Sequence, residues 1–191
     1  MKITYFGNFY PRVDNLSGHS TGIAILFSQV EGVDAINVVT RLETSLPHST
    51  RALQAGIKKI RLHPTWREGD PLSVVRAASK LYSFRRGTDL YFFNVYLTFM
   101  GNSSILNGIR LLLPFLTRTV TRKRTIVYLH NCVESQAFAR LGYKKGILCV
   151  TLARLVEKFL IRFTEVIVPL DFQVKSLNSS GVRVQLFGLS G

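Results

Sequence analysis

The chain has 191 residues, enough for one domain with its own core, and 25 Lys and Arg against 11 Asp and Glu give a formal net charge of +14. Its two cysteines, Cys132 and Cys149, make neither a CxxC pair nor a disulfide framework, so a cysteine-stapled secreted fold is excluded and a reducing cytosol is favoured. No window of roughly 18 uninterrupted apolar residues exists, so we expect a cytoplasmic protein without a membrane-spanning helix.

The first predicted strand covers residues 2–6 and runs into Gly7-Asn8. A polar loop with Gly18 and His19 follows, and then an apolar helix from about residue 22 to residue 30. Loop N–H groups and the positive end of a helix dipole together favour an anion, so we expect Gly18 to contact a phosphate and His19 to contact a ligand. The spacing of the glycines is neither GxGxxG nor a Walker A loop, which disfavours dinucleotide and P-loop NTPase sites.

The next two predicted strands cover residues 35–41 and residues 59–63, the second ending before Pro64. A helix then begins at Asp70-Pro71, because Asp is a good N-cap and proline suits the first helical position. Apolar residues at helical spacing predict the buried stripe of this helix: Leu72, Val75, Ala78, Leu81 and Tyr82.

Strands and helices continue to alternate to the end of the sequence. Further strands are predicted over residues 89–95, 125–131, 165–169 and 183–187. Between them lie a helix that starts at Ser103 and kinks at Pro114, and a long helix over residues 145–163. Strands separated by helices of ten or more residues indicate right-handed βαβ units, so we predict an α/β fold with one Rossmann-like, doubly wound and mainly parallel sheet.

His130 closes an apolar strand and is the strongest candidate for a functional residue. Ligands of open α/β sheets bind at the carboxyl edge, where a histidine can hydrogen-bond sugar hydroxyls or phosphate, or move a proton. The alternative is that His130 is a core residue whose ring nitrogens form hydrogen bonds with backbone groups. Glu134 lies four residues further on, within reach of an incoming hydroxyl, although a solvated side chain is the commoner role.

Motifs for a metal are lacking in the sequence. It contains no HExxH, no Asp-x-Asp pair and no Cys/His cluster, so we predict no metal site and no bound cofactor.

Basic residues cluster beside apolar helical segments, as around residues 118–124 and residues 140–145. Apolar surface rimmed by Lys and Arg is typical of shallow docking on an anionic bilayer. Nucleic-acid binding would also use this charge, but no RRM, KH, helix-turn-helix or zinc-finger pattern accompanies it, so nucleic acid is disfavoured.

Several short stretches carry a resemblance to a known family. They are residues 2–11 ("KI.....Y.P"), 36–40 ("V.V.T"), 89–94 ("D.(V/I)(V/I)H.H"), 127–131 ("V.T.H.."), 155–177 ("E......AD.VI..S......L") and 182–188 ("V.VIPNGVD"). In this order they resemble the N-terminal, acceptor-side domain of GT-B glycosyltransferases of the family-4-like group. The chain departs from the family at Ser17-Gly18, where two glycines are usual, and at Asn94, where histidine is common.

The resemblance implies transfer of a sugar from a nucleotide-sugar to a lipid-linked or saccharide acceptor at the inner face of a membrane. It implies that Gly18 binds the donor phosphate and that His130 is catalytic. The acceptor contacts that it implies are His19, Asn94, Asn131 and Glu134.

In the family a second, donor-binding domain follows, at the point where this sequence ends in Gly191. We therefore expect residues 1–191 to form a single N-terminal domain that is inactive alone and needs a separate donor-binding domain. The chain could be one half of a split enzyme with a separately encoded donor-binding subunit, a natural remnant, or a fragment. The alternative is a non-catalytic α/β binding module that recruits a partner or an anionic membrane surface.

Overall fold

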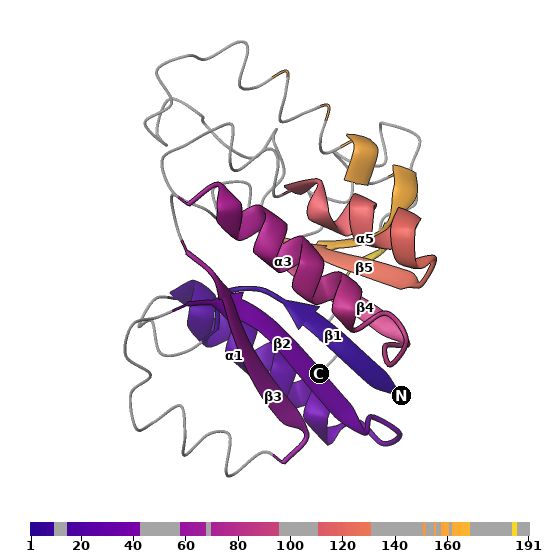
Figure 1. The fold of residues 1–191 in the computed structure, drawn as a ribbon. Helices are drawn as coiled ribbons and strands as arrows, with labels where there is room; N and C mark the ends of the chain where they lie inside the picture. The colour runs from indigo at the N-terminus through magenta and orange to yellow at the C-terminus, as the bar shows by residue number, and fades with distance from the viewer. Residues whose placement is uncertain are drawn as a thin grey trace.

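The computed structural model describes residues 1–9, 15–42, 58–67, 70–95, 111–130, 151, 155, 158–160, 162–168 and 185–186. Within these residues seven strands form one sheet in the order β3-β2-β1-β4-β5-β6-β7, and every neighbouring pair is parallel (Figure 1). The strands are β1 (Lys2–Phe6), β2 (Ala35–Arg41), β3 (Ile60–Trp66), β4 (Leu90–Val95), β5 (Arg124–Leu129), β6 (Glu165–Val168) and β7 (Gln185–Leu186). The predicted Rossmann-like α/β fold is confirmed.

Helices cover both faces of the sheet: α1 (Asn15–Gln29) lies on one face, and α3 (Leu72–Ser83) and α5 (Leu113–Thr121) lie on the other (Figure 1). Neighbouring strand residues point to opposite faces, so Tyr5 and Phe92 join the core under α1 while Phe6 and Phe93 join the core under α3 and α5. All six residues of β4 are buried, as expected for a parallel strand covered on both faces. No helix in the described part of the chain is long and apolar enough to cross a membrane.

The strand order reverses direction between β1 and β4. From β1 the chain continues through α1 to β2 on one side, whereas β4 is followed by β5 on the other side. The connections leaving these two neighbouring strands therefore diverge at their carboxyl ends, which opens the crevice in which folds of this type bind ligands.

Gly7 directly follows β1 at this crevice, and only a glycine fits there. A Cβ added to it would lie 2.9 Å from Ser20 Oγ, 3.1 Å from Tyr5 Cε1 and 3.2 Å from Asn94 Cβ. These neighbours come from α1, β1 and β4, so the missing side chain is what lets the three elements meet.

We expect Gly7→Ala to lower the free energy of unfolding by about 1–3 kcal/mol, because the added methyl group overpacks this junction. Urea unfolding measures the loss. Gly18→Ala is the matched control: Gly18 lies in α1 with nothing within 4 Å of the Cβ position. That change is expected to stabilise the helix by about 0.5–1 kcal/mol. Equal stability of the two variants would contradict the packing at Gly7.

Two predicted boundaries are wrong. Helix α1 begins at Asn15, not near residue 22, so Gly18 and His19 lie in its first turns and not in a loop. Strand β3 continues through Pro64 to Trp66, since it is an edge strand and an edge position tolerates proline. Pro114 lies in the first turn of α5, a position that suits proline. Residues 103–110 of the predicted helix lie outside the described residues, so the kink at Pro114 stays a prediction.

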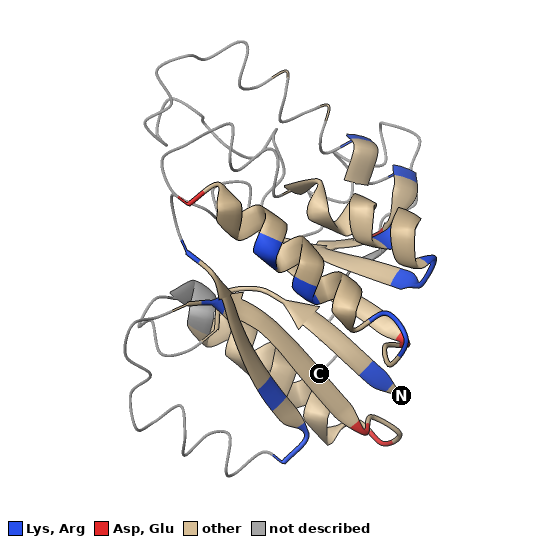
Figure 2. Cartoon of the chain, viewed as in Figure 1, with Lys and Arg blue, Asp and Glu red and all other residues tan. Residues whose placement is uncertain are grey.

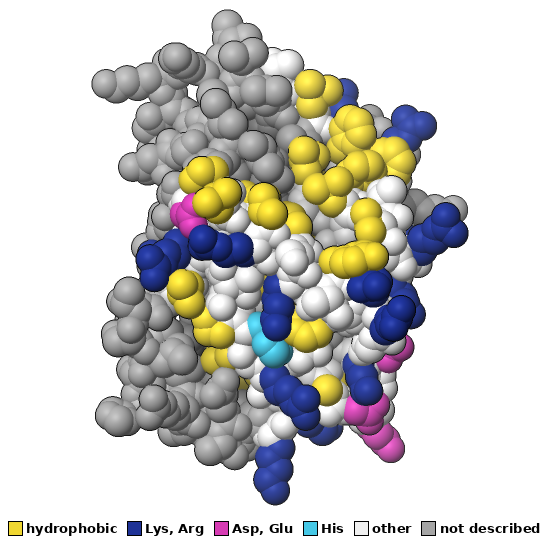
Figure 3. Space-filling view, in the orientation of Figure 1, with side chains coloured by type: hydrophobic (Ala, Val, Ile, Leu, Met, Phe, Trp, Pro, Cys, Tyr) yellow, Lys and Arg dark blue, Asp and Glu magenta, His cyan; other side chains and the backbone are white. Residues whose placement is uncertain are grey.

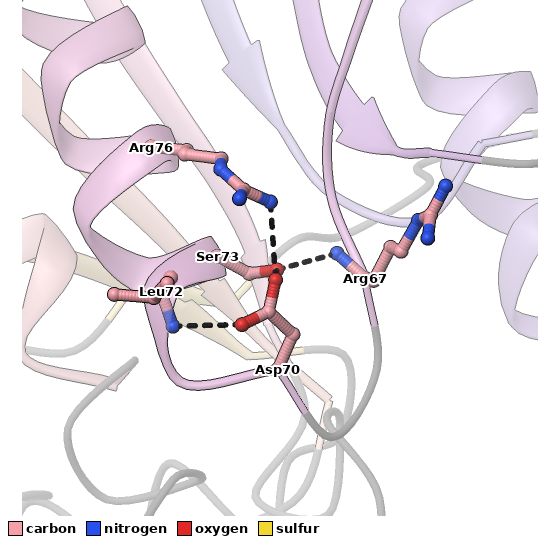
Figure 4. Close-up of polar contacts among 5 residues, drawn as sticks. All are labelled: Arg67, Asp70, Leu72, Ser73 and Arg76. Atoms are coloured by element: carbon pink, nitrogen blue, oxygen red, sulfur yellow. Dashed lines mark hydrogen bonds and ion pairs between the residues drawn. The ribbon is translucent and has the colours of Figure 1, made fainter.

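Asp70 caps α3 as predicted (Figure 4). Its carboxylate accepts hydrogen bonds from the Leu72 N–H at 2.9 Å, the Ser73 hydroxyl at 3.0 Å and Arg76 Nη1 at 3.1 Å. Ser73 Oγ in turn accepts from the Arg67 N–H at 2.7 Å. These contacts tie the start of α3 to the end of β3.

The predicted buried stripe of α3 is wrong at three of its five positions, whereas Leu81 is buried and Ala78 packs against the core as predicted. The helix buries Ser73, Val74, Ala77 and Leu81, whereas Leu72, Val75 and Tyr82 are exposed. The contacts of Ser73 with Asp70 and Arg67 fix the rotation of the helix, and the small Ser73 and Ala77 side chains let its backbone lie close to the sheet.

Candidate functional site

A chain of hydrogen bonds crosses the sheet at the crevice between β1 and β4. The Tyr5 hydroxyl lies 2.8 Å from Ser20 Oγ and 3.1 Å from the Ser20 carbonyl oxygen, which joins β1 to α1. Asn94 Nδ2 on β4 donates to Tyr5 Oη at 2.7 Å. Asn94 Oδ1 lies 2.5 Å from Nε2 of His130, which directly follows β5. Four elements thus meet in one polar network.

The inner members of this network are shielded from water. Tyr5 and Asn94 are fully buried, and Ser20 is nearly so. Burial raises the pKa of the Tyr5 hydroxyl. This effect is larger than the lowering of the pKa by its hydrogen bonds to Ser20 and Asn94. Tyr5 therefore keeps its proton at neutral pH and stays a hydrogen-bond donor.

The direction of the hydrogen bonds assigns the tautomer of His130. The Tyr5 O–H donates to the Ser20 carbonyl, so Tyr5 Oη accepts from the amide of Asn94. This arrangement turns Asn94 Oδ1 toward His130, where it accepts from Nε2–H. In the neutral ring Nδ1 then carries the lone pair, and it can accept a hydrogen bond from a hydroxyl.

The ring of His130 also contacts a second histidine. The ring of His19 from α1 lies edge-on at 4.9 Å between centroids, and the ring of Tyr128 lies at 4.5 Å. Burial lowers the pKa of His130 to about 3, and the charge that His19 can carry acts in the same direction. His130 is therefore uncharged at neutral pH.

We expect His130 to make stability pH-dependent. Its pKa is about 3 in the folded protein, against 6.5 for an ordinary histidine, so the unfolded chain binds the proton more readily. The stabilisation is complete above the unfolded pKa and falls as the pH drops, by about 2 kcal/mol between about pH 7.5 and about pH 5.

Urea unfolding at several pH values measures this loss. In His130→Gln the free energy of unfolding should depend less steeply on pH. His63→Gln is the control: burial also lowers the pKa of His63, and this variant removes only the contribution of His63. An unchanged slope in His130→Gln would contradict the burial of a neutral His130.

Two further polar atoms at the same edge have no hydrogen-bond partner among the residues that the structure describes. They are Asn8 Oδ1, which follows β1, and Thr40 Oγ1, near the end of β2. Their residues are only 7% and 4% exposed. A buried polar atom without a partner costs about 1–3 kcal/mol, which a ligand hydroxyl at this position would recover.

The structure brings three of the predicted site residues together: His130, Asn94 and His19. Gly18 lies next to His19 in the first turns of α1, with an exposed backbone. Asn131 and Glu134 lie outside the described residues. The functional roles of all six residues stay predictions.

The sequence did not indicate that Tyr5 lies at the centre of the network, or that Ser20 contacts it. Tyr5 lies in a strand that is apolar on both sides, so its hydroxyl looked like part of the core. The sequence cue that would have found it is the glycine two residues later, since Gly7 marks the place where α1 and β4 come close to β1.

Comparison with protein-family models found no match to this chain, and comparison with curated proteins likewise found none. The resemblance to GT-B glycosyltransferases thus stays a prediction, as does the expectation that no metal or cofactor is needed. Any functional conclusion has to come from the geometry of the site.

Proposed function

We propose that this chain is the acceptor-side half of an enzyme that transfers a sugar from a nucleotide-sugar to a lipid-linked or saccharide acceptor. A separate donor-binding domain would complete the site. The observation that carries the proposal is a neutral, oriented histidine at the divergence of β1 and β4.

In this proposal His130 binds and orients a hydroxyl group. With a pKa of about 3 the imidazole is a weak base but a good neutral hydrogen-bond acceptor at Nδ1. Asn94 holds the ring by its Nε2–H, so the lone pair has a fixed direction. The acceptor oxygen forms a bond to the anomeric carbon while the bond to the nucleotide diphosphate breaks. The diphosphate leaves with the electron pair and takes up the proton that the acceptor hydroxyl loses.

Further contacts of a hydroxyl-rich ligand are available at the same edge. Asn8 Oδ1 and Thr40 Oγ1 are buried and unpaired, and sugar hydroxyls are chemically suited to both. The donor diphosphate would approach the first turns of α1 near Gly18, where the helix dipole is positive and no side chain blocks the backbone.

A co-expression experiment tests the proposal. The chain is produced with the product of the adjacent coding region and incubated with labelled UDP-sugars or GDP-sugars and membranes of the source organism. Label transferred to lipid or saccharide by the pair, and by neither protein alone, supports the proposal. Absence of transfer with every nucleotide-sugar would contradict it and favour the non-catalytic binding module.

A further inference from the structure

An apolar patch lies on the surface of α5 and of the helical residues that precede β6 (Figure 3). Its five large side chains are each between 43% and 60% exposed: Leu116, Val120, Leu155, Phe159 and Phe163. We call these residues the α5 patch. Single exposed apolar residues are ordinary, but five that gather on neighbouring helical segments mark an interaction surface.

Aromatic contacts join the two segments into one surface. The ring of Phe115 on α5 lies edge-on to Phe159 at 5.8 Å and to Phe163 at 5.0 Å. Phe159 and Phe163 stack at 5.7 Å. Leu116 and Val120 are four residues apart on α5, so they project from the same side of the helix.

The charges around the α5 patch are positive. Exposed basic residues on the same two segments are Arg118, Arg122, Lys158 and Arg162 (Figure 2). Glu165, an acid at the start of β6 and two residues after Phe163, is neutralised by Arg124 through an ion pair at 2.8 Å.

The opposite face of the sheet lacks this combination. Helix α1 and the residue after it also expose a leucine and a valine four residues apart, Leu26 and Val30. However, α1 contains no Lys, Arg, Asp or Glu. Exposed apolar side chains thus occur on both faces, but the face that carries α5 combines them with cations. Helix α3 on that same face also exposes Leu72 and Val75 beside Arg76.

We propose that the α5 patch docks the protein on the surface of an anionic lipid bilayer. Leucine and phenylalanine side chains enter the boundary between headgroups and acyl chains, and the basic rim contacts lipid phosphates. The positive rim is complementary to lipid phosphates. A nucleic-acid backbone would also attract this rim, but it offers no apolar surface for the centre of the patch to contact.

Vesicle flotation tests the apolar part, with phosphatidylcholine alone and with an equimolar mixture of phosphatidylcholine and phosphatidylglycerol. We expect the protein to float only with the anionic vesicles. Leu116→Ser with Val120→Ser should weaken this binding roughly tenfold or more. The matched pair Leu26→Ser with Val30→Ser, on the other face, should bind like the unchanged protein.

A second set of variants tests whether the basic residues contribute to vesicle binding. It also tests the proposal if the serine variants fail to fold. Lys158→Gln with Arg162→Gln should weaken binding to anionic vesicles roughly tenfold or more. Lys59→Gln with Arg61→Gln removes the same charge near the far edge of the sheet, at β3, and should have little effect.

Three results would overturn the proposal. They are equal flotation with and without anionic lipid, equal losses for each test pair and its control, and absence of flotation. Gel filtration adds one more: a dimer that becomes a monomer on Leu116→Ser with Val120→Ser, without vesicle binding, would assign the patch to a contact between copies of this chain.

Discussion

Replacement of His130 by alanine is expected to lower sugar transfer by the completed enzyme roughly 100-fold, because the acceptor hydroxyl loses the group that orients it. His63→Ala is the matched control. Like His130, His63 contacts an asparagine, since its Nε2 lies 3.2 Å from Asn37 Oδ1. It is at the far edge of the sheet, on β3, so its loss should leave the rate within a factor of about two.

The pH dependence of the rate distinguishes a hydrogen-bonding role from a general base. A neutral His130 with a pKa of about 3 predicts that this residue leaves no inflection in the rate between about pH 5 and about pH 8. An inflection in the pH–rate profile at about pH 6.5 that disappears in His130→Gln would contradict the role of His130 as a neutral group that positions the hydroxyl. Equal losses in His130→Ala and His63→Ala would contradict a site at β5.

Asn94→Ala is expected to lower the free energy of unfolding by about 2–4 kcal/mol. Asn94 is fully buried and is the link between Tyr5 and His130. Its truncation removes the donor to Tyr5 Oη and the acceptor of His130 Nε2–H, and each buried group left without a partner costs about 1–3 kcal/mol. Urea unfolding at neutral pH measures the loss.

Asn37→Ala provides the comparison for this second prediction. Asn37 Oδ1 contacts His63 Nε2 in a half-buried position on β2, where water can replace the lost partner. We expect it to cost less than about 1 kcal/mol. If both asparagine variants lost the same stability, the hydrogen-bond network at the crevice would not be the source of the effect.

The parts of the fold that the sequence predicts are those determined by local patterns. Strand β4 is a continuous apolar run, and this alone identifies a parallel strand buried on both faces. The cap of α3 was predictable because Asp70 acts on residues two and three positions away. Both features depend on neighbours in the sequence.

The parts that the sequence could not predict depend on residues far apart along the chain. The first turns of α1 have the composition of a loop, with Gly18, Ser20 and glycine again at position 22, yet Ser20 is held in the helix against Tyr5. Tyr5 and Asn94 are 89 positions apart, and no pattern in either strand indicates that they meet. The sequence therefore predicted Asn94 and His130 as site residues, but it did not indicate that Tyr5 joins Asn94 to Ser20.

The central claim is that a neutral His130, held by Asn94, presents Nδ1 to a ligand hydroxyl at the crevice. NMR of ¹⁵N-labelled imidazoles tests it most directly, with a pH titration followed by addition of methyl glycosides of the common hexoses. We predict an Nε2-protonated ring that stays neutral down to about pH 5, and an Nδ1 resonance that moves with the glycosides but not in Asn94→Ala. A ring that titrates near about pH 6.5, or an Nδ1 resonance unmoved by every glycoside, would contradict the claim.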